Sequence, residues 1–196
     1  MRFYHIDSQG LIHSGMTLVA DDLGFTRFGR GVSLCQPIHT DAADACMRES
    51  MFELVRQYEF PHLPSRLRSF FGCSEDALDA WLPAFSSHHG VYEVECDTFS
   101  MHNEKFLEIY SAVQVDGQVF QAFQSDMILE NIRRYWGSAI SNIPGSNIQQ
   151  SDGRAFQAPV LPQFLVSEYR LHSLPYGPDR WEALLVPPVR VLRRVL

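Results

Sequence analysis

Strand-like segments at both ends of the chain, with helical segments between them, predict an α+β fold. Residues 2–7 (RFYHID) form a short aromatic-rich run, and residues 181–186 and 189–196 are two apolar runs separated by Pro187-Pro188. This order of elements disfavours a repeating βαβ pattern and its parallel sheet. The length of 196 residues and a hydrophobic content of 45% suit a single domain, 1–196, with one sizeable core.

The first forty residues predict two short strands followed by a loop. The strand over residues 2–7 ends at the turn Ser8-Gln9-Gly10, and residues 11–20 can hold the second strand. The glycine-rich segment that follows, up to Thr40, is predicted to be a loop.

Between Thr40 and residue 85 the sequence predicts a helix, a strand and a second helix. Thr40-Asp41 begins the first helix, and Pro61 and Pro64 end it. Its predicted buried face consists of Ala43, Met47, Leu54 and Tyr58, widened by Cys46 and Met51. Residues 67–73 are a strand candidate. Ser74 then caps a helix whose apolar face consists of Leu78, Trp81, Leu82 and Phe85.

The second half of the chain predicts three strands, a helix and a long loop. Residues 91–95 alternate as in a half-buried strand, and residues 98–125 contain two short strands around the turn Asp116-Gly117. Residues 126–136 form a helix with Ile128, Ile132 and Tyr135 on one face. The polar segment that follows, about 138–165, is predicted to be a lid or a partner-binding loop.

Composition limits the classes of function. The formal net charge is −7, with 23 acidic and 16 basic residues, which disfavours a dedicated duplex-binding protein. We expect no membrane span and a cytoplasmic location, because no segment has the length of an apolar span or the pattern of a secretory signal. The four cysteines, Cys35, Cys46, Cys73 and Cys96, form no CxxC pair, so we expect reduced thiols and no metal site.

Three segments contain residues that could take part in catalysis or binding, although each segment is ordinary by itself. His5 interrupts the first apolar strand, following Tyr4. The segment from Pro64 to Trp81 holds Ser69 and two phenylalanines in a strand that runs into a helix. Glu182 directly precedes the apolar run of the penultimate strand, where a glutamate is usually solvated.

In this order, the three segments resemble the ADP-ribosyltransferase fold, in the branch with a His-Tyr-Glu active site. The bacterial rifampin ADP-ribosyltransferases have the most similar rhythm of strand, helix ending in Trp, and strand. The chain also resembles an uncharacterised bacterial family that shares the motif PSRL-x-S-x-F, here residues 64–71, and a YW-x-G-like segment, here residues 135–138. The resemblance implies split antiparallel β-sheets with flanking helices.

The resemblance also implies a chemistry and a role for each residue. Cleavage of the nicotinamide–ribose bond of NAD builds positive charge on the ribose, which a fixed carboxylate would offset, and this role falls to Glu182. His5, with Tyr4 beside it, would fix the dinucleotide, and Phe71 would stack on the nicotinamide ring. Ser69 would brace the carboxamide pocket. Arg66 is our own candidate for the pyrophosphate, because a guanidinium binds such groups in a bidentate manner.

The sequence departs from the family at position 71, where Phe replaces the expected Tyr. A competing alignment uses residues 28–33 (FGRGVS), which resemble the Phe-Gly-Lys-Gly-Ile-Tyr segment of poly(ADP-ribose) polymerases and put Ser33 at the Tyr position. The alignment through Phe71 is preferred, because its strand is followed at once by a helix and then by a strand.

The resemblance therefore predicts a mono-ADP-ribosyltransferase that transfers ADP-ribose from NAD to a macromolecular acceptor. Small bacterial enzymes of this fold often look like toxins, with or without an antitoxin, or like phage-defence effectors. The negative net charge favours a protein acceptor. RNA or DNA remains an alternative acceptor because of the basic aromatic patch 133–136 and the cluster Arg190, Arg193 and Arg194. The alternative is a non-catalytic binding or immunity module of the same fold, which Phe71 favours. Modification of a drug, as by the rifampin enzymes, is a third reading.

Overall fold

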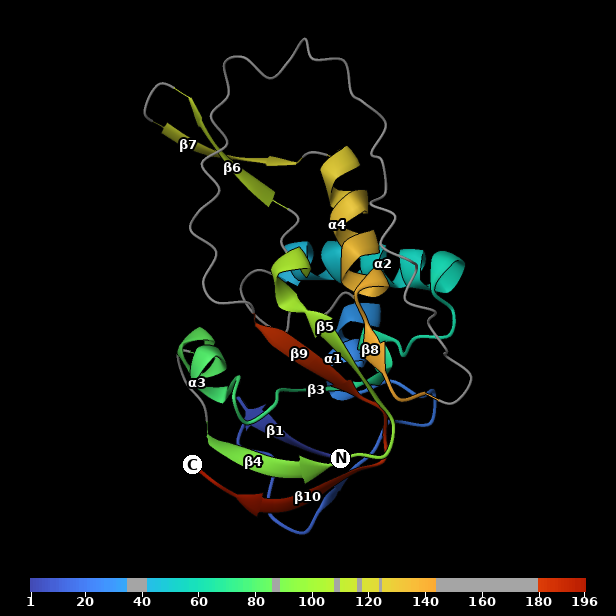
Figure 1. Ribbon diagram of the computed structural model, residues 1–196, viewed down its shortest axis with the longest axis vertical. Helices are drawn as coiled ribbons and strands as arrows, with labels where there is room; N and C mark the ends of the chain where they lie inside the picture. The colour runs from blue at the N-terminus through green and yellow to red at the C-terminus, as the bar shows by residue number, and fades with distance from the viewer. Residues whose placement is uncertain (35–41, 86–88, 108–109, 116–117, 124, 144–179) are drawn as a thin grey trace.

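Two four-stranded antiparallel sheets form the frame of the protein (Figure 1). The computed structural model describes residues 1–34, 42–85, 89–107, 110–115, 118–123, 125–143 and 180–196. The first sheet has the order β1 (Arg2–Asp7), β4 (Gly90–Glu95), β10 (Val189–Arg194) and β2 (Thr17–Leu18). The second has the order β3 (Phe70–Gly72), β9 (Trp181–Leu185), β5 (Phe99–Asn103) and β8 (Ile140–Ser141). The α+β class predicted from the sequence is confirmed.

The two sheets meet where β1 and β3 touch. Tyr4 and Cys73 form an isolated antiparallel bridge, with reciprocal backbone hydrogen bonds of 2.8 and 2.9 Å. In the second sheet, Gly72 pairs with Ala183, so by register Cys73 lies opposite Glu182. One level of the fold therefore joins Tyr4, Cys73 and Glu182 across three neighbouring strands.

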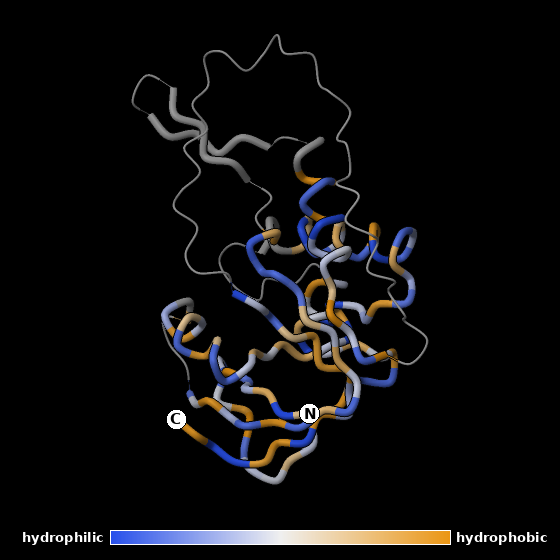
Figure 2. The backbone as a smooth tube through the Cα atoms, viewed as in Figure 1, coloured by the Kyte–Doolittle hydropathy of each residue, from blue (hydrophilic) through white to orange (hydrophobic). Residues whose placement is uncertain are grey.

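The second sheet buries apolar side chains on both of its faces. One core cluster lies between the two sheets and includes Phe3, Phe99, Ala183 and Leu185. The other lies against the helices and includes Leu184, with Phe71 packed on it. Hydrophobic and hydrophilic positions interchange along the strands and along the helices (Figure 2).

Helices cover the outer face of the second sheet. α2 (Ala42–Glu59) and α4 (Ser125–Gly137) pack together there, and α1 (Arg27–Ser33) rests on the 3-10 turn η1 (Arg66–Arg68). The shorter α3 (Leu78–Trp81), η2 (Leu82–Ala84) and η3 (Glu104–Leu107) connect strands. The hairpin of β6 (Tyr110–Val115) and β7 (Gln118–Phe123) forms a separate two-stranded sheet (Figure 1).

The glycine-rich segment after residue 20 is partly helical, so the prediction of a loop up to Thr40 is wrong for α1. Thr26 caps this helix by accepting a hydrogen bond from the backbone N–H of Gly29. Gly29 is needed for packing, because a Cβ there would lie 1.8 Å from the carbonyl oxygen of Leu67. Ser33, the residue of the competing alignment, is an exposed residue at the end of α1.

The first long helix exists, but its predicted buried face is wrong. Met47, Leu54 and Tyr58 are exposed, whereas Glu49, Phe52 and Val55 face the core. The periodicity of apolar residues selected the outer stripe because the inner face contains a glutamate. The face predicted for α4 is confirmed, since Ile128, Ile132 and Tyr135 are all buried.

Several other local expectations needed adjustment. The strand expected over residues 67–73 begins as the turn η1, and the strand β3 itself covers only residues 70–72. Ala77, not Ser74, is the N-cap of α3. β4 is buried on both faces rather than one, because β1 and β10 flank it in the middle of its sheet.

The predicted lid, about 138–165, lies mostly outside the described residues. Its first part contains β8, which pairs with β5 as an edge strand. Among the described cysteines, Cys73 and Cys96 are buried and form no disulfide. The described helices include none with the length and apolar character that crossing a membrane would require.

Candidate active site

A buried arginine, Arg66, is the centre of a polar network beneath the helices. The turn η1 holds it in place, because Ser65 caps that turn through the backbone N–H of Leu67. Its guanidinium donates two hydrogen bonds to Glu49 of α2, Nε to Oε2 at 2.7 Å and Nη2 to Oε1 at 3.2 Å. This bidentate pairing fixes both the position and the plane of the guanidinium.

The other edge of the guanidinium binds Glu182 at the start of β9. Nη1 of Arg66 donates to Glu182 Oε1 and, at 2.7 Å, to the hydroxyl of Tyr135 in α4. The Tyr135 hydroxyl in turn donates to Oε1 of Glu182. Four elements that are distant in the sequence, α2, η1, α4 and β9, thereby converge on one arginine.

Both hydrogen bonds to Glu182 end on the same carboxylate oxygen. The Oε2 atom receives none from the part of the chain that the structure describes. The Glu182 side chain is only 5% exposed. Within the described residues, Glu182 is therefore a buried carboxylate anchored through one of its two oxygens.

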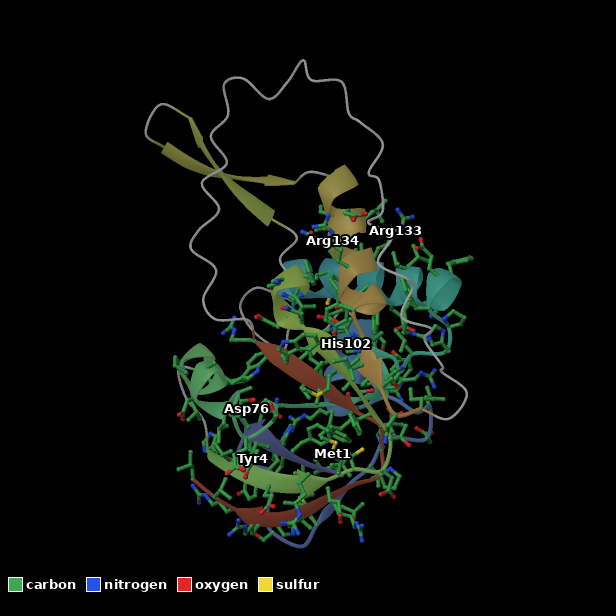
Figure 3. All side chains as sticks on the ribbon, in the orientation of Figure 1. Met1, Tyr4, Asp76, His102, Arg133 and Arg134 are labelled. Carbon is green, nitrogen blue, oxygen red and sulfur yellow. The ribbon has the colours of Figure 1, made fainter. Side chains whose placement is uncertain are left out.

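Aromatic rings enclose the charged groups. The guanidinium carbon of Arg66 lies 4.9 Å from the ring centre of Phe71 and 5.3 Å from that of Tyr135, which are cation–π distances. The imidazole of His102 in β5 stacks flat on Tyr135, with 4.5 Å between ring centres. Figure 3 labels His102 in the middle of the molecule.

His102 also fixes the position of Tyr135 through hydrogen bonds. Its Nδ1 lies 3.1 Å from the backbone oxygen of Tyr135, and its Nε2 lies 2.6 Å from Ser100 Oγ. A carbonyl can only accept, so Nδ1 carries the proton and Nε2 accepts from the serine. Burial lowers the pKa of His102 to about 3, so the ring is neutral.

The electrostatics of the network shift the pKa values of its two carboxylates, Glu49 and Glu182, in opposite directions. Burial opposes ionisation of Glu49, but the Arg66 guanidinium outweighs it and lowers the pKa of Glu49. For Glu182 burial dominates; Arg66 opposes it, Glu49 adds repulsion, and the pKa of Glu182 is raised. Two acids in different environments, one anionic and one with raised proton affinity, are a pattern found in acid–base sites.

His5 and Phe71 come together at the junction of the sheets. The Nδ1 atom of His5 lies 2.6 Å from the backbone oxygen of Phe71, so this nitrogen is the donor. Burial lowers the pKa of His5, although the hydrogen bond to Phe71 opposes the shift. The Phe71 ring packs edge-on against Phe28 at 5.1 Å.

The structure does not bring the side chains of His5 and Glu182 together. His5 follows Phe3 on the inner face of β1, and its ring meets that of Phe70 between the sheets. Glu182 shares a face with Leu184, toward the helices. The two residues lie at about the same level of the fold but on opposite faces of the second sheet.

The remaining predicted site residues, Tyr4, Ser69 and Arg66, also differ in their surroundings. Tyr4 points away from His5, and desolvation together with Glu75 and Glu93 raises its pKa. Ser69 is 1% exposed and has no partner for its hydroxyl among the described residues. Arg66, proposed for a pyrophosphate, is instead committed to Glu49, Tyr135 and Glu182.

Sequence reasoning missed Glu49, Ser100 and His102. It placed Tyr135 on a packed helix face, in the motif 135–138 and in the basic aromatic patch, but not in a hydrogen-bonded site with Glu182. One signal could have found part of the network: a tyrosine on the buried face of a helix needs a partner for its hydroxyl. No periodicity identifies Glu49, because it occupies a position where an apolar residue is expected. The described residues include no group of three His, Cys, Asp or Glu side chains that could hold a metal ion.

The basic patches are largely paired. Arg133 and Arg134, labelled on α4 in Figure 3, bind Glu59 and Glu130, while Tyr135 and Trp136 are buried. In the C-terminal cluster, Arg190 pairs with Glu95 and Arg193 with Glu93. The buried rings of the patch 133–136 are not available to stack on nucleic-acid bases.

Comparison with protein families identifies the family of this chain. The model of a family described as protein of unknown function, DUF2441, matches residues 30–147, more than half of the chain. The chain belongs to the DUF2441 family. In this DUF2441 protein the matched region contains Glu49, Arg66, His102 and Tyr135 and the segments 64–71 and 135–138, whereas His5 and Glu182 lie outside it. No curated protein matches the chain.

Proposed function

We propose that this protein is a mono-ADP-ribosyltransferase that cleaves NAD and transfers ADP-ribose to a macromolecular acceptor, with Glu182 as the catalytic carboxylate. The observation that carries the proposal is the state of Glu182: it is buried, Arg66 and Tyr135 both bind its Oε1 atom, and no hydrogen bond from the described residues reaches Oε2. A preorganised charge of this kind stabilises positive charge that develops on a ribose.

The arrangement of the strands supports the same proposal. The resemblance implied split antiparallel sheets with the histidine on the first strand, the aromatic residue on a middle strand and the acid on a late one. These residues lie on β1, β3 and β9, and the bridge between Tyr4 and Cys73 is at the level of Glu182. With strands about 4.8 Å apart, roughly 10 Å separates the backbones of β1 and β9 there, which is within the reach of a dinucleotide.

The groups near this junction fit parts of NAD. Ser69 Oγ has no protein partner among the described residues and could bond a polar group such as a carboxamide. The Phe71 ring offers a face of the kind that accepts a planar cation, and it already lies beneath a guanidinium. When bound, NAD would supply the scissile bond and the leaving nicotinamide. Glu182 would hold a ribose hydroxyl and offset the developing charge.

We propose a protein acceptor and an intracellular role as a toxin or phage-defence effector, acting in the cytoplasm with or without an antitoxin. The pairing of Arg133, Arg134, Arg190 and Arg193 with carboxylates supports a protein over RNA or DNA, since paired cations contribute less to phosphate binding.

A second candidate is a non-catalytic binding or immunity module. The observation that favours it is the placement of His5 and Glu182 on opposite faces of the second sheet. In such a module, the Arg66 network would stabilise the fold and no bond would be cleaved.

Incubation of the purified chain with labelled NAD and cell lysate tests the proposal. Nicotinamide release and label transfer are expected, with a loss of about 100-fold or more in Glu182→Gln. Glu93→Gln is the matched control: it is also a buried, ion-paired glutamate but lies in the other sheet, and it should retain activity. Phe71→Tyr should be tolerated.

Absence of both nicotinamide release and label transfer in the unmodified chain contradicts the proposal. Calorimetry with NAD then examines the second candidate, since a binding module of this fold can retain affinity without turnover. Equal activity in Glu182→Gln and the unmodified chain would instead exclude Glu182 as the catalytic carboxylate.

A further inference from the structure

Glu182 shares its arginine with a second carboxylate, and this sharing suggests how the site is tuned. We propose that Glu49 and Tyr135 are positioning residues for Glu182. Glu49 competes with Glu182 for the positive charge of Arg66, and Tyr135 fixes the Oε1 atom of Glu182 by a hydrogen bond. The catalytic consequence rests on the proposed function, whereas the effect on Glu182 itself does not.

Glu49 accepts more hydrogen bonds from the Arg66 guanidinium than Glu182 does. It accepts from both Nε and Nη2 of Arg66, and its side chain is fully buried. Glu182 binds only Nη1, which also donates to Tyr135. Arg66 is therefore shared by two carboxylates, and the negative charge of Glu49 disfavours ionisation of Glu182, which binds the guanidinium through one nitrogen only.

Tyr135 has a different part in the network. Its hydroxyl accepts from Arg66 and donates to Glu182, so it is a directional link between cation and carboxylate. The ring cannot turn away, because His102 stacks on one face and Phe52 meets it edge-on at 5.1 Å. A hydrogen bond donated to the ionised carboxylate favours that form.

The charged and titratable groups around Glu182 come from each packed element. They are Arg66 from η1, Glu49 with Arg48 from α2, Tyr135 from α4 and His102 from β5. Arg48 reaches the outer side of Glu49 at 3.2 Å and is one-third exposed. His102 stays neutral, since burial lowers its pKa to about 3. Apart from Arg66 itself, Glu49 and Tyr135 are therefore the groups whose removal should change the pKa of Glu182 most, and in opposite directions.

A carbon-13 NMR titration of glutamate side-chain carboxyls in the full chain measures this directly, and Glu182→Gln assigns the signal. In Glu49→Gln the Glu182 midpoint should move to lower pH by about one pH unit, because a neighbouring like charge has been removed. In Tyr135→Phe it should move to higher pH, because the donor is lost while the ring remains. A purely structural role would not give opposite signs.

Glu59→Gln is the matched control on α2, since Glu59 pairs with exposed Arg133 outside the network, and its Glu182 midpoint should not move. Midpoints that do not move, or that move in the same direction in both variants, overturn the proposal. If circular dichroism shows that Glu49→Gln does not fold, Tyr135→Phe becomes the deciding variant. A Glu182 midpoint in Tyr135→Phe that is unchanged or lowered then overturns the proposal. The titration needs no turnover, so an inactive protein would refute the proposed function without affecting this result. If the protein is active, the acidic limb of kcat/KM should follow the same two shifts.

Discussion

Replacement of Arg66 by methionine should destabilise the protein severely, and the structure indicates how much. Methionine approximates the length of the arginine stem, and its thioether would enter the same enclosure of Phe52, Phe71 and Tyr135 rings. The loss therefore comes mainly from charge. The side chains of Glu49 and Glu182, which are 0% and 5% exposed, would remain buried without their shared cation. Breaking a buried ion pair from one side costs about 3–5 kcal/mol.

The pH dependence of Arg66→Met provides a sharper check. Without the cation, burial should raise the folded-state pKa of both Glu49 and Glu182 above their unfolded values. The protonated forms then favour folding at low pH, and this contribution is lost as pH rises through the folded-state pKa. In the unmodified chain the pKa of Glu49 is lowered, so its contribution is present above its unfolded pKa and lost as pH falls through the folded pKa. The difference in stability between the two proteins should therefore narrow from pH ~7 to pH ~5.

Urea unfolding of both proteins, followed by circular dichroism at the two pH values, measures this difference. Arg133→Met is the control, because it removes an arginine from an exposed ion pair with Glu59 and should cost about 1 kcal/mol or less. A loss in Arg66→Met no larger than the control, or a difference that does not narrow at the lower pH, would refute the reasoning.

Three further predictions concern local features. Gly29→Ala should lower the free energy of unfolding by about 3 kcal/mol, because its Cβ would lie 1.8 Å from Leu67 O, whereas Gly137→Ala, with its nearest neighbour at 3.9 Å, should change it by about 0.5 kcal/mol or less; equal urea midpoints would contradict this. The ring signals of His102 should not titrate in NMR spectra between pH ~5 and ~8, because burial lowers its pKa to about 3; a midpoint in that range would show a hydrated ring. Cys73 should resist iodoacetamide in the folded protein and react in urea, because burial raises its pKa to about 12, so that about one thiol in ten thousand is ionised at pH 8; rapid labelling without denaturant would disprove this.

The sequence predicted β1, β9, β10 and α4 well, because these segments are rich in apolar residues with the spacing of their element. The run RFYHID became β1, and the two runs around Pro187-Pro188 became β9 and β10. Two strands were expected on either side of Asp116-Gly117, and β6 and β7 lie there as an antiparallel pair, while the two expected turn residues lie outside the described residues. In these segments local propensity and tertiary burial agree.

The prediction was wrong where burial favours a polar residue or a close backbone contact. In α2 the core-facing side contains Glu49, so the uninterrupted apolar stripe through Leu54 pointed to the wrong face. In α1 the glycines suggested a loop, although Gly29 permits contact with the Leu67 carbonyl. Both outcomes depend on a partner that is distant in the sequence.

The candidate site was predicted in part for the same reason. Glu182, Arg66 and Phe71 meet in the structure, although their spacing in the sequence gives no sign that Arg66 binds Glu182. The order of the three segments placed His5 and Glu182 at one level of the fold. It could not determine on which face of the sheet each side chain lies, since a change of register by one residue would reverse the face.

The strands β9 and β10 are consecutive in the chain, yet each occupies an interior position in a different sheet. β3 and β5 pair through β9, and β4 needs β10 on its second side. During synthesis, neither sheet can be completed until residues 181–194 have left the ribosome. Until then, the edges of β3, β4 and β5 are unpaired in the nascent chain, and such edges are prone to aggregation. Completion of both sheets is therefore coupled to the arrival of this one segment, residues 181–194.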